Sequence, residues 1–163
     1  MEELDPQQQL RLAERLYAGL QVGQELGPWD TVFTEKDGRD YAASIDDENA
    51  WYLERSLLGQ PVAHPAMTAA FYFSLCQEAW LKVLGDAAQS LVAIHAKAEH
   101  LYTNPVRIGK RLTVRGKVAE KYVRRDKYYV VVELWTVDED GRDIVRSRDT
   151  LLLTPVRISE KAD

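Results

Sequence analysis

The sequence predicts an α+β domain in which an antiparallel sheet wraps around one long central helix. Three observations predict it. Apolar side chains in the first half of the chain recur at helical spacing, one segment near the middle is apolar on nearly every face, and the second half shows strand-like segments joined by short turns. A helix that is apolar all round must be buried all round, so we expect the strands that follow it to cover it.

Length and composition fit one globular domain, which we expect to span residues 1–163 with residues 1–25 as an N-terminal helical extension. The chain has 163 residues, of which 45% are hydrophobic and 29% charged, which excludes the disordered and low-complexity classes. A formal net charge of -5 argues against a nucleic-acid binder. No apolar run is long enough to cross a bilayer and the first residues lack signal-peptide character, so we expect a cytoplasmic protein.

The first half of the chain indicates two short helices with a strand between them. Apolar side chains at helical spacing predict a helix near the N-terminus: Leu10, Ala13, Leu16, Tyr17 and Leu20. Leu26-Gly27-Pro28 interrupts this pattern, and residues 29–33 indicate a strand. Thr34 resembles an N-cap and opens a second short helix through Ala43, which the polar run 46–49 ends.

The segment from Ala66 to Leu84, AMTAAFYFSLCQEAWLKVL, predicts the central helix. Pro65 precedes it, and proline is favoured in the first turn of a helix. The segment is too short to span a membrane, so other parts of the protein must surround it.

Four strand-like segments follow and supply that cover. They are residues 91–102, 111–123, 127–137 and 143–154, which are rich in Val, Tyr and Leu. In the first of them, alternation places one set of side chains on a common face: Val92, Ile94, Ala96 and Ala98. Residues 124–126 and 138–141 indicate hairpin turns, so consecutive strands form a meander. A long helix held in the curl of an antiparallel sheet is the hotdog fold.

Three segments resemble one known family, the MaoC-like hydratases and dehydratases. Residues 33–52, FTEKDGRDYAASIDDENAWY, are similar to the family's overhang segment, where a Thr and then an aromatic residue followed by Ala lead to Asp-x-Asn-Pro-x-His. Residues 59–67, GQPVAHPAM, resemble the lead-in to its central helix, and residues 101–118, LYTNPVRIGKRLTVRGKV, resemble its Pro-Val-x-x-Gly-Asp strand. The three occur in the family's order, and the resemblance covers most of the chain beyond residue 28.

The resemblance implies a chemistry and a set of residues. The family adds water to 2-enoyl thioesters or forms them by removing it, with an Asp and a His that activate one water. Asp47 matches the family's Asp and Asn49 its Asn, whereas Ala50 stands at the Pro and Tyr52 at the His. A phenol with a pKa near ~10 is a poor base at neutral pH. In this departure the chain is similar to the non-catalytic N-terminal half or subunit of 3-hydroxyacyl thioester dehydratases.

His64 offers a replacement for the missing histidine. It lies immediately before Pro65, at the positive end of the central helix, which favours a neutral imidazole that can act as a base. The candidate catalytic residues are therefore Asp47, Asn49, Tyr52 and His64. Structural alternatives stand beside these roles: Asp47 and Asn49 could end a helix by bonding nearby amides, and His64 could be a loop residue before a cap.

A basic stretch from residue 107 to residue 127 is the candidate binding site for the carrier of the thioester. Coenzyme A presents a pyrophosphate and a 3′-phosphate, which favour Arg and Lys at the mouth of a tunnel. The candidates are Arg107, Lys110, Arg111, Arg124 and Arg125. The alternative is the solvated outer face and the turns of an antiparallel sheet. Beyond a thioester of coenzyme A or acyl carrier protein, we expect no cofactor.

For the other candidate nucleophiles and metal ligands, the sequence favours structural roles. Cys76 lies in the apolar helix, where a thiol behaves as a small buried hydrophobe, and a single cysteine cannot form an internal disulfide. By alternation His95 shares a face with Lys97 and Glu99, and we interpret His95 and His100 as half-exposed strand or interface residues. No spacing typical of metal ligands is present in the sequence, so we expect no metal site.

Three functions remain open. In the first, the chain hydrates or dehydrates 2-enoyl and 3-hydroxyacyl thioesters in fatty acid metabolism, with Asp47, Asn49 and His64 at the reaction end of an acyl tunnel. In the second, it is a non-catalytic acyl-thioester-binding subunit whose hotdog partner supplies the Asp and His. An acyl-CoA thioesterase is the weakest, because Glu78 is the only acid within residues 66–84. Open edge strands predict a homodimer, or a heterodimer with another hotdog subunit.

Overall fold

The computed structural model describes residues 5–91 and 93–153. Its helices are α1 (Pro6–Gly19), α2 (Glu35–Ser44), α3 (Ala50–Leu53) and α4 (Ala69–Leu84), with the short 3-10 helices η1 (Pro65–Thr68) and η2 (Gly85–Ser90) before and after α4. The strands are β1 (Glu25–Val32), β2 (Ile94–Tyr102), β3 (Arg111–Arg124), β4 (Lys127–Asp138) and β5 (Asp143–Leu152). They form one sheet in the order β1-β3-β4-β5-β2.

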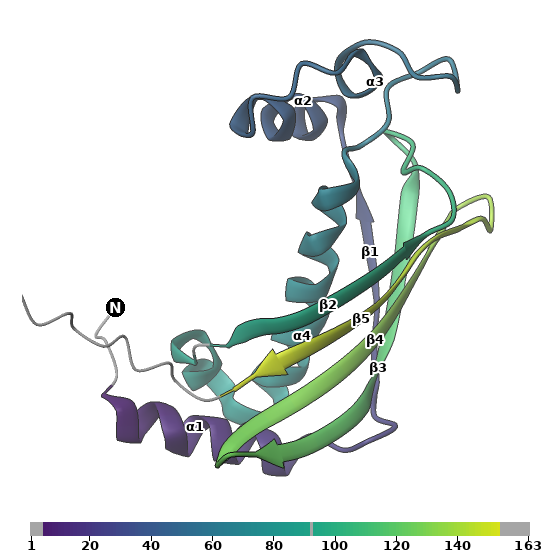
Figure 1. The fold of residues 1–163 in the computed structure, drawn as a ribbon. Coiled ribbons are helices and arrows are strands. Elements are labelled where there is room, and N and C mark those ends of the chain that lie inside the picture. The colour runs from purple at the N-terminus through teal and green to yellow at the C-terminus, as the bar shows by residue number, and fades with distance from the viewer. Residues whose placement is uncertain (1–4, 92, 154–163) are drawn as a thin grey trace, which may run out of the picture.

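The sheet curls around α4, as Figure 1 shows. Every neighbouring pair of strands is antiparallel, and β3, β4 and β5 follow one another through the predicted turns. Arg125 and Asp126 adopt φ angles of 50° and 56°, the left-handed backbone that a two-residue hairpin turn needs. The core fills the space between α4 and the sheet, and it includes Phe71, Leu75, Leu112 and Val114. The predicted α+β architecture is confirmed.

The first strand begins earlier than predicted. Leu26-Gly27-Pro28 lies inside β1 rather than before it, and the register with β3 shifts between Leu26 and Trp29. Gly27 has a φ of 82°, and a Cβ there would lie 2.7 Å from Leu75 Cδ2 and 2.9 Å from the Val114 carbonyl oxygen. Only glycine fits this close approach of the backbone to the core, so the apparent interruption is a bulge in a strand.

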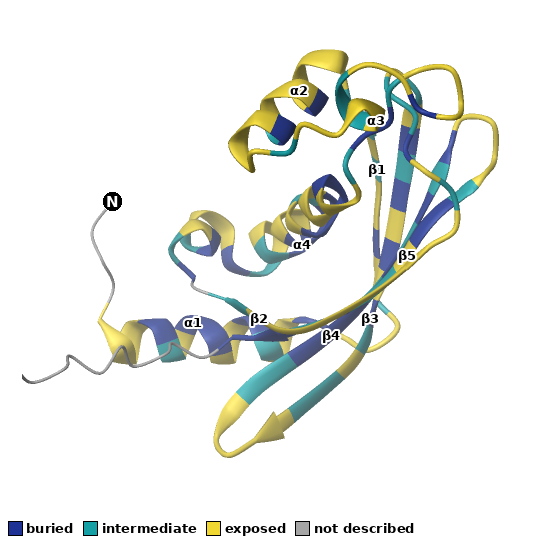
Figure 2. Ribbon diagram, turned by 45° about the horizontal axis from the view of Figure 1, so that its top comes forward, coloured by how far each residue is buried: buried dark blue, intermediate teal, exposed yellow. Residues whose placement is uncertain are grey.

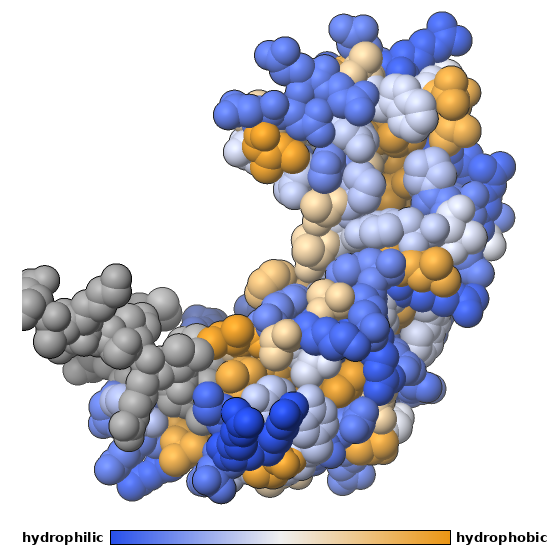
Figure 3. All heavy atoms as spheres, in the orientation of Figure 1, coloured by the Kyte–Doolittle hydropathy of each residue, from blue (hydrophilic) through white to orange (hydrophobic). Residues whose placement is uncertain are grey.

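The helix α4 is covered on one side only. Its buried residues are Phe71, Tyr72, Leu75, Cys76, Ala79 and Leu84. Phe73 is 63% exposed and Leu81 is 38% exposed, so the prediction of a helix buried all round is wrong for this chain. The reason is geometric: the five strands curl around part of the helix and leave the opposite face open (Figure 2). Figure 3 shows the molecule hollowed on that side, with apolar atoms along the hollow.

The edge strand β2 departs from strict alternation. Its register with β5 shifts between His95 and Lys97, so the predicted sharing of one face by these two residues is broken. The His95 ring packs on α4 instead, with its centroid 4.3 Å from that of Tyr72 and 5.7 Å from that of Phe73. Two predicted strand residues, Val92 and Thr154, lie outside the described residues.

The N-terminal helix α1 forms as predicted and is held against the sheet. Asp5 and Gln8 form a capping box at its start, and its buried residues include Leu12, Ala13 and Leu16. Lys121 of β3 donates to the carbonyl oxygens of Tyr17 and Leu20, and its Nζ lies 4.5 Å from the Tyr17 ring centroid. A cation is favourable where a helix ends, so Lys121 fastens α1 to β3.

Candidate functional site

The candidate site lies on the segment between β1 and α4, which carries α2 and α3 past one end of the central helix (Figure 1). Thr34 caps α2 as predicted, since its hydroxyl accepts the Asp37 N–H at 3.2 Å. Hydrogen bonds from the Thr34 N–H and hydroxyl in turn lower the pKa of Asp37. After α2, Asp46 turns the chain with a φ of 52°, and the Asp47 N–H donates to the Ala42 carbonyl oxygen at 2.9 Å. These local bonds fix where the Asp47 side chain begins.

Asp47 and Asn49 both bond backbone amides close to them in sequence. Asp47 Oδ1 accepts the N–H of Asn49 at 2.9 Å, and Asn49 Oδ1 accepts the N–H of Trp51 at 3.0 Å. Asn49 therefore caps α3, which is the structural role named above as the alternative to a catalytic one. The second carboxylate oxygen of Asp47, Oδ2, takes no part in these bonds and faces His64.

The structure brings three of the four predicted catalytic side chains together. His64 Nε2 lies 3.7 Å from Asp47 Oδ2, and the two side chains are 23% and 28% exposed. The Tyr52 ring meets the imidazole edge-on with centroids 4.9 Å apart, and the Tyr41 ring lies 5.3 Å away. Tyr52, which the resemblance matches to the family's histidine, therefore contacts His64. Tyr41 is a member of the cluster that sequence reasoning did not single out.

His64 also caps the short helix η1, and this bond decides its tautomer. Its Nδ1 accepts the N–H of Ala66 at 3.1 Å. A nitrogen that accepts a hydrogen bond carries no proton, so the proton of a neutral imidazole sits on Nε2 and faces Asp47. The Met67 N–H donates to the His64 carbonyl oxygen at 3.0 Å, and Pro65 has no N–H. The first amides of η1 are thus engaged and are not free to bind a thioester carbonyl.

Two hollows lie at opposite ends of β2. One, of about 310 Å³, lies at the end of β2, and its lining includes Tyr52 and Pro65, next to His64, but neither Asp47 nor His64. The other, of about 280 Å³, lies between α4 and the start of β2, and its lining includes Tyr72, Phe73, Trp80, Leu91, His95 and Leu151. Both walls are mainly apolar or aromatic, which suits a hydrocarbon ligand.

Tyr102 fixes the end of β2 beside the candidate site. Its hydroxyl donates to the Pro65 carbonyl oxygen at 3.1 Å and lies 3.1 Å from the Thr68 hydroxyl. Sequence reasoning missed Tyr102, although its place in the LYTNP segment, which resembles a family strand, was a signal that could have indicated it. The bond ties the strand to the turn that carries His64.

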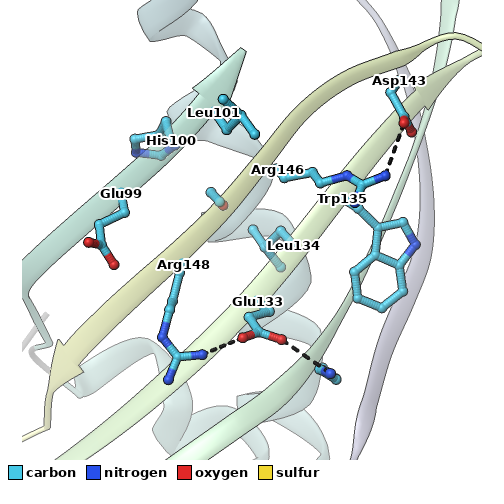
Figure 4. A pocket seen from close by; sticks show the side chains of 11 residues that line it. Glu99, His100, Leu101, Glu133, Leu134, Trp135, Asp143, Arg146 and Arg148 are labelled. Carbon is cyan, nitrogen blue, oxygen red and sulfur yellow. Dashed lines mark hydrogen bonds and ion pairs between the residues drawn. The ribbon is translucent and has the colours of Figure 1, made fainter. Parts of the chain in front are cut away.

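A larger hollow of about 590 Å³ lies on the outer face of the sheet (Figure 4). Glu133 and Trp135 line it, and on β4 they alternate with Leu134, which belongs to the core. Its charged side chains bond to one another, in the pairs Arg148–Glu133, Lys117–Glu133 and Arg146–Asp143. None of the predicted site residues lines it, and its charges are compensated within the sheet.

The five basic candidates do not gather in one place. Arg124 and Arg125 lie at the turn between β3 and β4, whereas Arg107, Lys110 and Arg111 lie before or at the start of β3. The 14 residues of β3 separate the two groups by about 45 Å, so one tunnel mouth cannot contain all five. In the sequence they look like one basic stretch, but an extended strand, β3, holds its two ends apart.

Two of these basic residues already have acidic partners. Arg107 binds Asp138 at 2.6 Å and also binds Asp140, while Lys110 binds Glu139 at 2.7 Å. Hydrogen bonds from these cations lower the pKa values of Asp140 and Glu139. These ion pairs hold the β4–β5 turn together. Arg107 and Lys110 thus have the structural role in a turn of the sheet that was the alternative to binding coenzyme A.

Other side chains that could be reactive lie away from the Asp47–His64 pair. Cys76 is 3% exposed, and burial raises the pKa of its thiol to about 12, as expected of a structural cysteine. Glu78 is exposed on α4 and binds Lys82 at 2.7 Å.

Within the described part of the chain, no group of three or more His, Cys, Asp or Glu side chains could hold a metal ion. No helix in residues 5–91 and 93–153 is long and apolar enough to cross a membrane.

Comparison with known proteins assigns the family. A family model described as the FAS1-like dehydratase domain region matches residues 20–147. The chain belongs to this family. The FAS1-like dehydratase match includes the overhang segment with Asp47 and Tyr52 and the later His64, and it confirms the predicted resemblance to MaoC-like hydratases and dehydratases. No curated protein matches the sequence.

Solved structures confirm that this FAS1-like dehydratase family member has the hotdog fold. The chain is similar to the R-hydratase PhaJ1 from Pseudomonas aeruginosa, with a TM-score of 0.64 and 22% identity over 90% of this chain and 93% of that one. It is also similar to a MaoC-like dehydratase from Rhodospirillum rubrum, with a TM-score of 0.62 and 22% identity over 84% of this chain and 95% of that one. For the HadBC 3R-hydroxyacyl-ACP dehydratase complex from Mycobacterium tuberculosis, the TM-score is 0.66 and the identity is 16% over 78% of this chain and 92% of that one.

Proposed function

We propose that this chain adds water to 2-enoyl thioesters, or removes it from 3-hydroxyacyl thioesters, carried by coenzyme A or acyl carrier protein. The Asp47–His64 pair carries the proposal, because a carboxylate and an imidazole 3.7 Å apart stand together, each partly exposed, on the overhang of a dehydratase-family fold. The neighbour PhaJ1 is named as an R-hydratase, which supports the same class of reaction here.

Hydration requires two proton transfers, one away from water and one to C2 of the enoyl group. Asp47 Oδ2 is the free acceptor of the pair, and the His64 Nε2–H is its donor. In the proposed step the water oxygen bonds to C3 while Asp47 takes the water proton, and C2 receives the Nε2 proton. The proton on Asp47 then passes to His64, so only water and the thioester are consumed. Dehydration is the reverse.

The two apolar hollows support an acyl ligand. Tyr52 and Pro65, which lie beside His64, line the 310 Å³ hollow, and the separate 280 Å³ hollow lies against α4. Mainly apolar walls suit the hydrocarbon part of the substrate. The proposal needs no cofactor besides the carrier of the thioester.

Hydration of crotonyl-CoA by the purified protein, followed as loss of enoyl absorbance, tests the proposal. Turnover by the protein alone supports it. The decisive comparison adds a hotdog partner that carries an intact Asp-x-Asn-Pro-x-His motif. If the chain is inert by itself and turnover appears only with that partner, the independent-enzyme proposal fails.

A non-catalytic subunit is the second candidate, and two observations favour it. The resemblance matches Tyr52 to the family's histidine, and HadBC, a similar structure, is named as a 3R-hydroxyacyl-ACP dehydratase complex. Under this proposal the exposed face of α4 contacts another hotdog chain, which supplies the catalytic Asp and His. Nothing favours the thioesterase alternative, since Glu78 is exposed and paired with Lys82. A cytoplasmic location stays a prediction.

A further inference from the structure

The thioester carbonyl needs a hydrogen-bond donor that the first turn of η1 does not supply. When water adds to C3, negative charge builds on the carbonyl oxygen until C2 is protonated. Active sites stabilise such a charge with fixed N–H or O–H donors. The Ala66 N–H already donates to His64 Nδ1 and the Met67 N–H to the His64 carbonyl oxygen, so a donor other than these amides is required.

Tyr52 is the side chain that connects the Asp47–His64 pair with the 310 Å³ hollow. Its ring contacts the His64 imidazole, with the centroids 4.9 Å apart and the two planes at 60°. Tyr52 also lines the hollow, whereas Tyr41, the other ring beside His64, does not. A thioester whose acyl chain occupies the hollow would therefore reach the pair beside Tyr52.

The Tyr52 hydroxyl is not used elsewhere in the part of the chain that the structure describes. It forms no hydrogen bond with the described residues, and it is not one of their buried unpaired polar atoms, so a ligand can reach it. The hydroxyl of Tyr102, which lines the same hollow, instead donates to the Pro65 carbonyl oxygen at 3.1 Å. A phenol keeps its proton at neutral pH, so the Tyr52 hydroxyl is available as a donor.

The backbone on both sides of Tyr52 is held in place by hydrogen bonds. Tyr52 lies in α3, which Asn49 caps by accepting the Trp51 N–H at 3.0 Å. The Trp51 carbonyl oxygen accepts the N–H of Val62 at 3.0 Å, and Val62 pairs with Arg107 in an isolated bridge. A donor that is oriented before the reaction needs no reorganisation when charge develops, and α3 provides that orientation.

We propose that Tyr52 is a catalytic residue whose hydroxyl donates a hydrogen bond to the thioester carbonyl oxygen and stabilises the negative charge that develops there. This inference rests on the proposed function. It gives Tyr52 a role different from that of the histidine to which the resemblance matches it. A phenol is a poor base but a good donor, so a tyrosine at this place is compatible with catalysis by this chain.

Tyr52 donates a hydrogen bond in this step and keeps its proton. The water proton passes to Asp47, and the proton for C2 comes from His64 Nε2, as in the proposed function. As the water oxygen bonds to C3, the C2=C3 electron pair forms a C1=C2 bond and the carbonyl pair moves onto the oxygen, to which the Tyr52 O–H donates. When C2 is protonated, the C1=C2 pair binds the proton and the carbonyl bond forms again. No further reactant is needed.

Turnover of crotonyl-CoA by Tyr52→Phe tests the role of the hydroxyl, because phenylalanine keeps the ring beside His64. We expect kcat to fall about 10²-fold, as loss of one such donor does, and KM to change little, because the charge develops only in the transition state. Tyr122→Phe is the matched control, since it removes a hydroxyl near the far end of β3, where the ring stacks on Tyr129, and it should keep wild-type turnover. Wild-type kcat in a folded Tyr52→Phe protein would overturn the proposal.

The carbonyl of a bound thioester gives a readout that does not depend on turnover. Hexanoyl-CoA has no C2=C3 bond and cannot be hydrated, and its carbonyl carbon can be labelled with carbon-13 for NMR. Because a hydrogen bond to the oxygen deshields this carbon, we expect its resonance in the wild-type complex to lie downfield of that in the Tyr52→Phe complex. Equal positions in the two complexes, or no binding of hexanoyl-CoA by the wild type, would overturn the proposal. If the wild type shows the shift but is inert toward crotonyl-CoA, the proposed hydration fails and the contact of Tyr52 with the carbonyl is supported.

Discussion

At the scale of single residues, the Asp47–His64 pair gives its two members unequal roles. The Ala66 N–H engages His64 Nδ1, so the neutral imidazole donates through Nε2, and Asp47 is the member with a free lone pair. The helix terminus alone predicted His64 as the base, because it favours a neutral ring. Because the capping bond uses the one unprotonated nitrogen of a neutral ring, we propose instead that Asp47 is the base and His64 the proton donor.

Substitution of the pair tests these roles. We expect Asp47→Asn and His64→Ala each to lower turnover of crotonyl-CoA by about 10²-fold or more, as loss of a positioned acid–base group does. The free energy of unfolding should change by no more than about 1 kcal/mol, since both side chains lie in loops and His64 caps only a short helix. Asp46→Asn is the control, because Asp46 is exposed and asparagine tolerates its left-handed backbone. Near-normal turnover in His64→Ala would remove this mechanism.

Gly116 of β3 is a residue whose small size the packing requires. A Cβ there would lie 2.4 Å from Leu134 Cδ2 and 2.7 Å from the Glu133 carbonyl oxygen. Because the carbonyl belongs to the neighbouring strand, it cannot move without disturbing the sheet, and we expect Gly116→Ala to cost about 1–3 kcal/mol in urea denaturation. Gly38→Ala in α2, where the nearest atom is Ile108 Cδ1 at 3.4 Å, should be neutral or stabilising. Equal stability of the two variants would contradict this account.

At the scale of elements, the sequence predicts the strands well and their irregularities poorly. Alternating Val, Tyr and Leu and the two turns locate β3, β4 and β5 to within a residue or two. The bulge at Gly27 was mistaken for a break, because glycine and proline mark both features. The register shift after His95 turns that ring onto α4, and no local pattern shows where a strand slips by one residue.

The candidate site was predictable only where its residues are close in sequence or carry a motif. Asp47 and Tyr52 belong to the overhang and His64 to the segment that follows it, so their proximity could be expected. Outside that site, His100 Nε2 lies 3.7 Å from Asp149 Oδ1 because β5 pairs with β2 in one particular register. That register follows from the whole sheet, so the sequence favoured a half-exposed strand histidine and gave no indication of Asp149.

The β4–β5 turn should loosen in acid. Hydrogen bonds from Arg107 lower the pKa of Asp140, and those from Lys110 lower the pKa of Glu139. Burial alone would raise the pKa of Asp138, but Arg107 and two backbone N–H groups lower it overall. A lowered folded-state pKa means that this stabilisation is present above the ordinary carboxyl pKa of about 4 and is lost as pH falls through the folded values. We expect the urea midpoint to decrease from about pH 5 to about pH 2.

Substitution of Arg107, which binds both Asp138 and Asp140, tests whether this network causes the decrease of the urea midpoint in acid. Arg107→Gln should lower the urea midpoint at neutral pH and make it less dependent on acid, because Asp138 and Asp140 lose their main hydrogen-bond donor. Arg115→Gln, at an exposed position of β3, should leave both quantities as in the wild type. An unchanged acid dependence in Arg107→Gln would assign it to other carboxylates.

At the scale of the whole molecule, the open face of α4 predicts association. Phe73 and Leu81 are exposed there, and β2 is an unpaired edge of the sheet beside them. Joining two such faces would bury apolar surface and cover the 280 Å³ hollow on α4, so we expect sedimentation of the purified protein to show a dimer at micromolar concentration.

A charge placed on that face tests the dimer. Phe73→Glu should shift the protein to a monomer, because a carboxylate would be buried against apolar surface. Val123→Glu is the control, since Val123 is also exposed but lies at the far end of β3. A stable monomer of the wild type would count against the homodimer and leave pairing with a different hotdog chain, which mixed sedimentation would reveal.

The place of α4 in the chain has a consequence for synthesis of the protein on the ribosome. The most apolar segment, residues 66–84, is translated before β3, β4 and β5, which bury its inner face in the finished molecule. At ordinary elongation rates, residues 85–152 take roughly 3–14 s to add. During those seconds a nascent helix with Phe71, Leu75 and Phe73 has no sheet to cover it. That interval makes the nascent chain a natural client for chaperones that bind apolar segments.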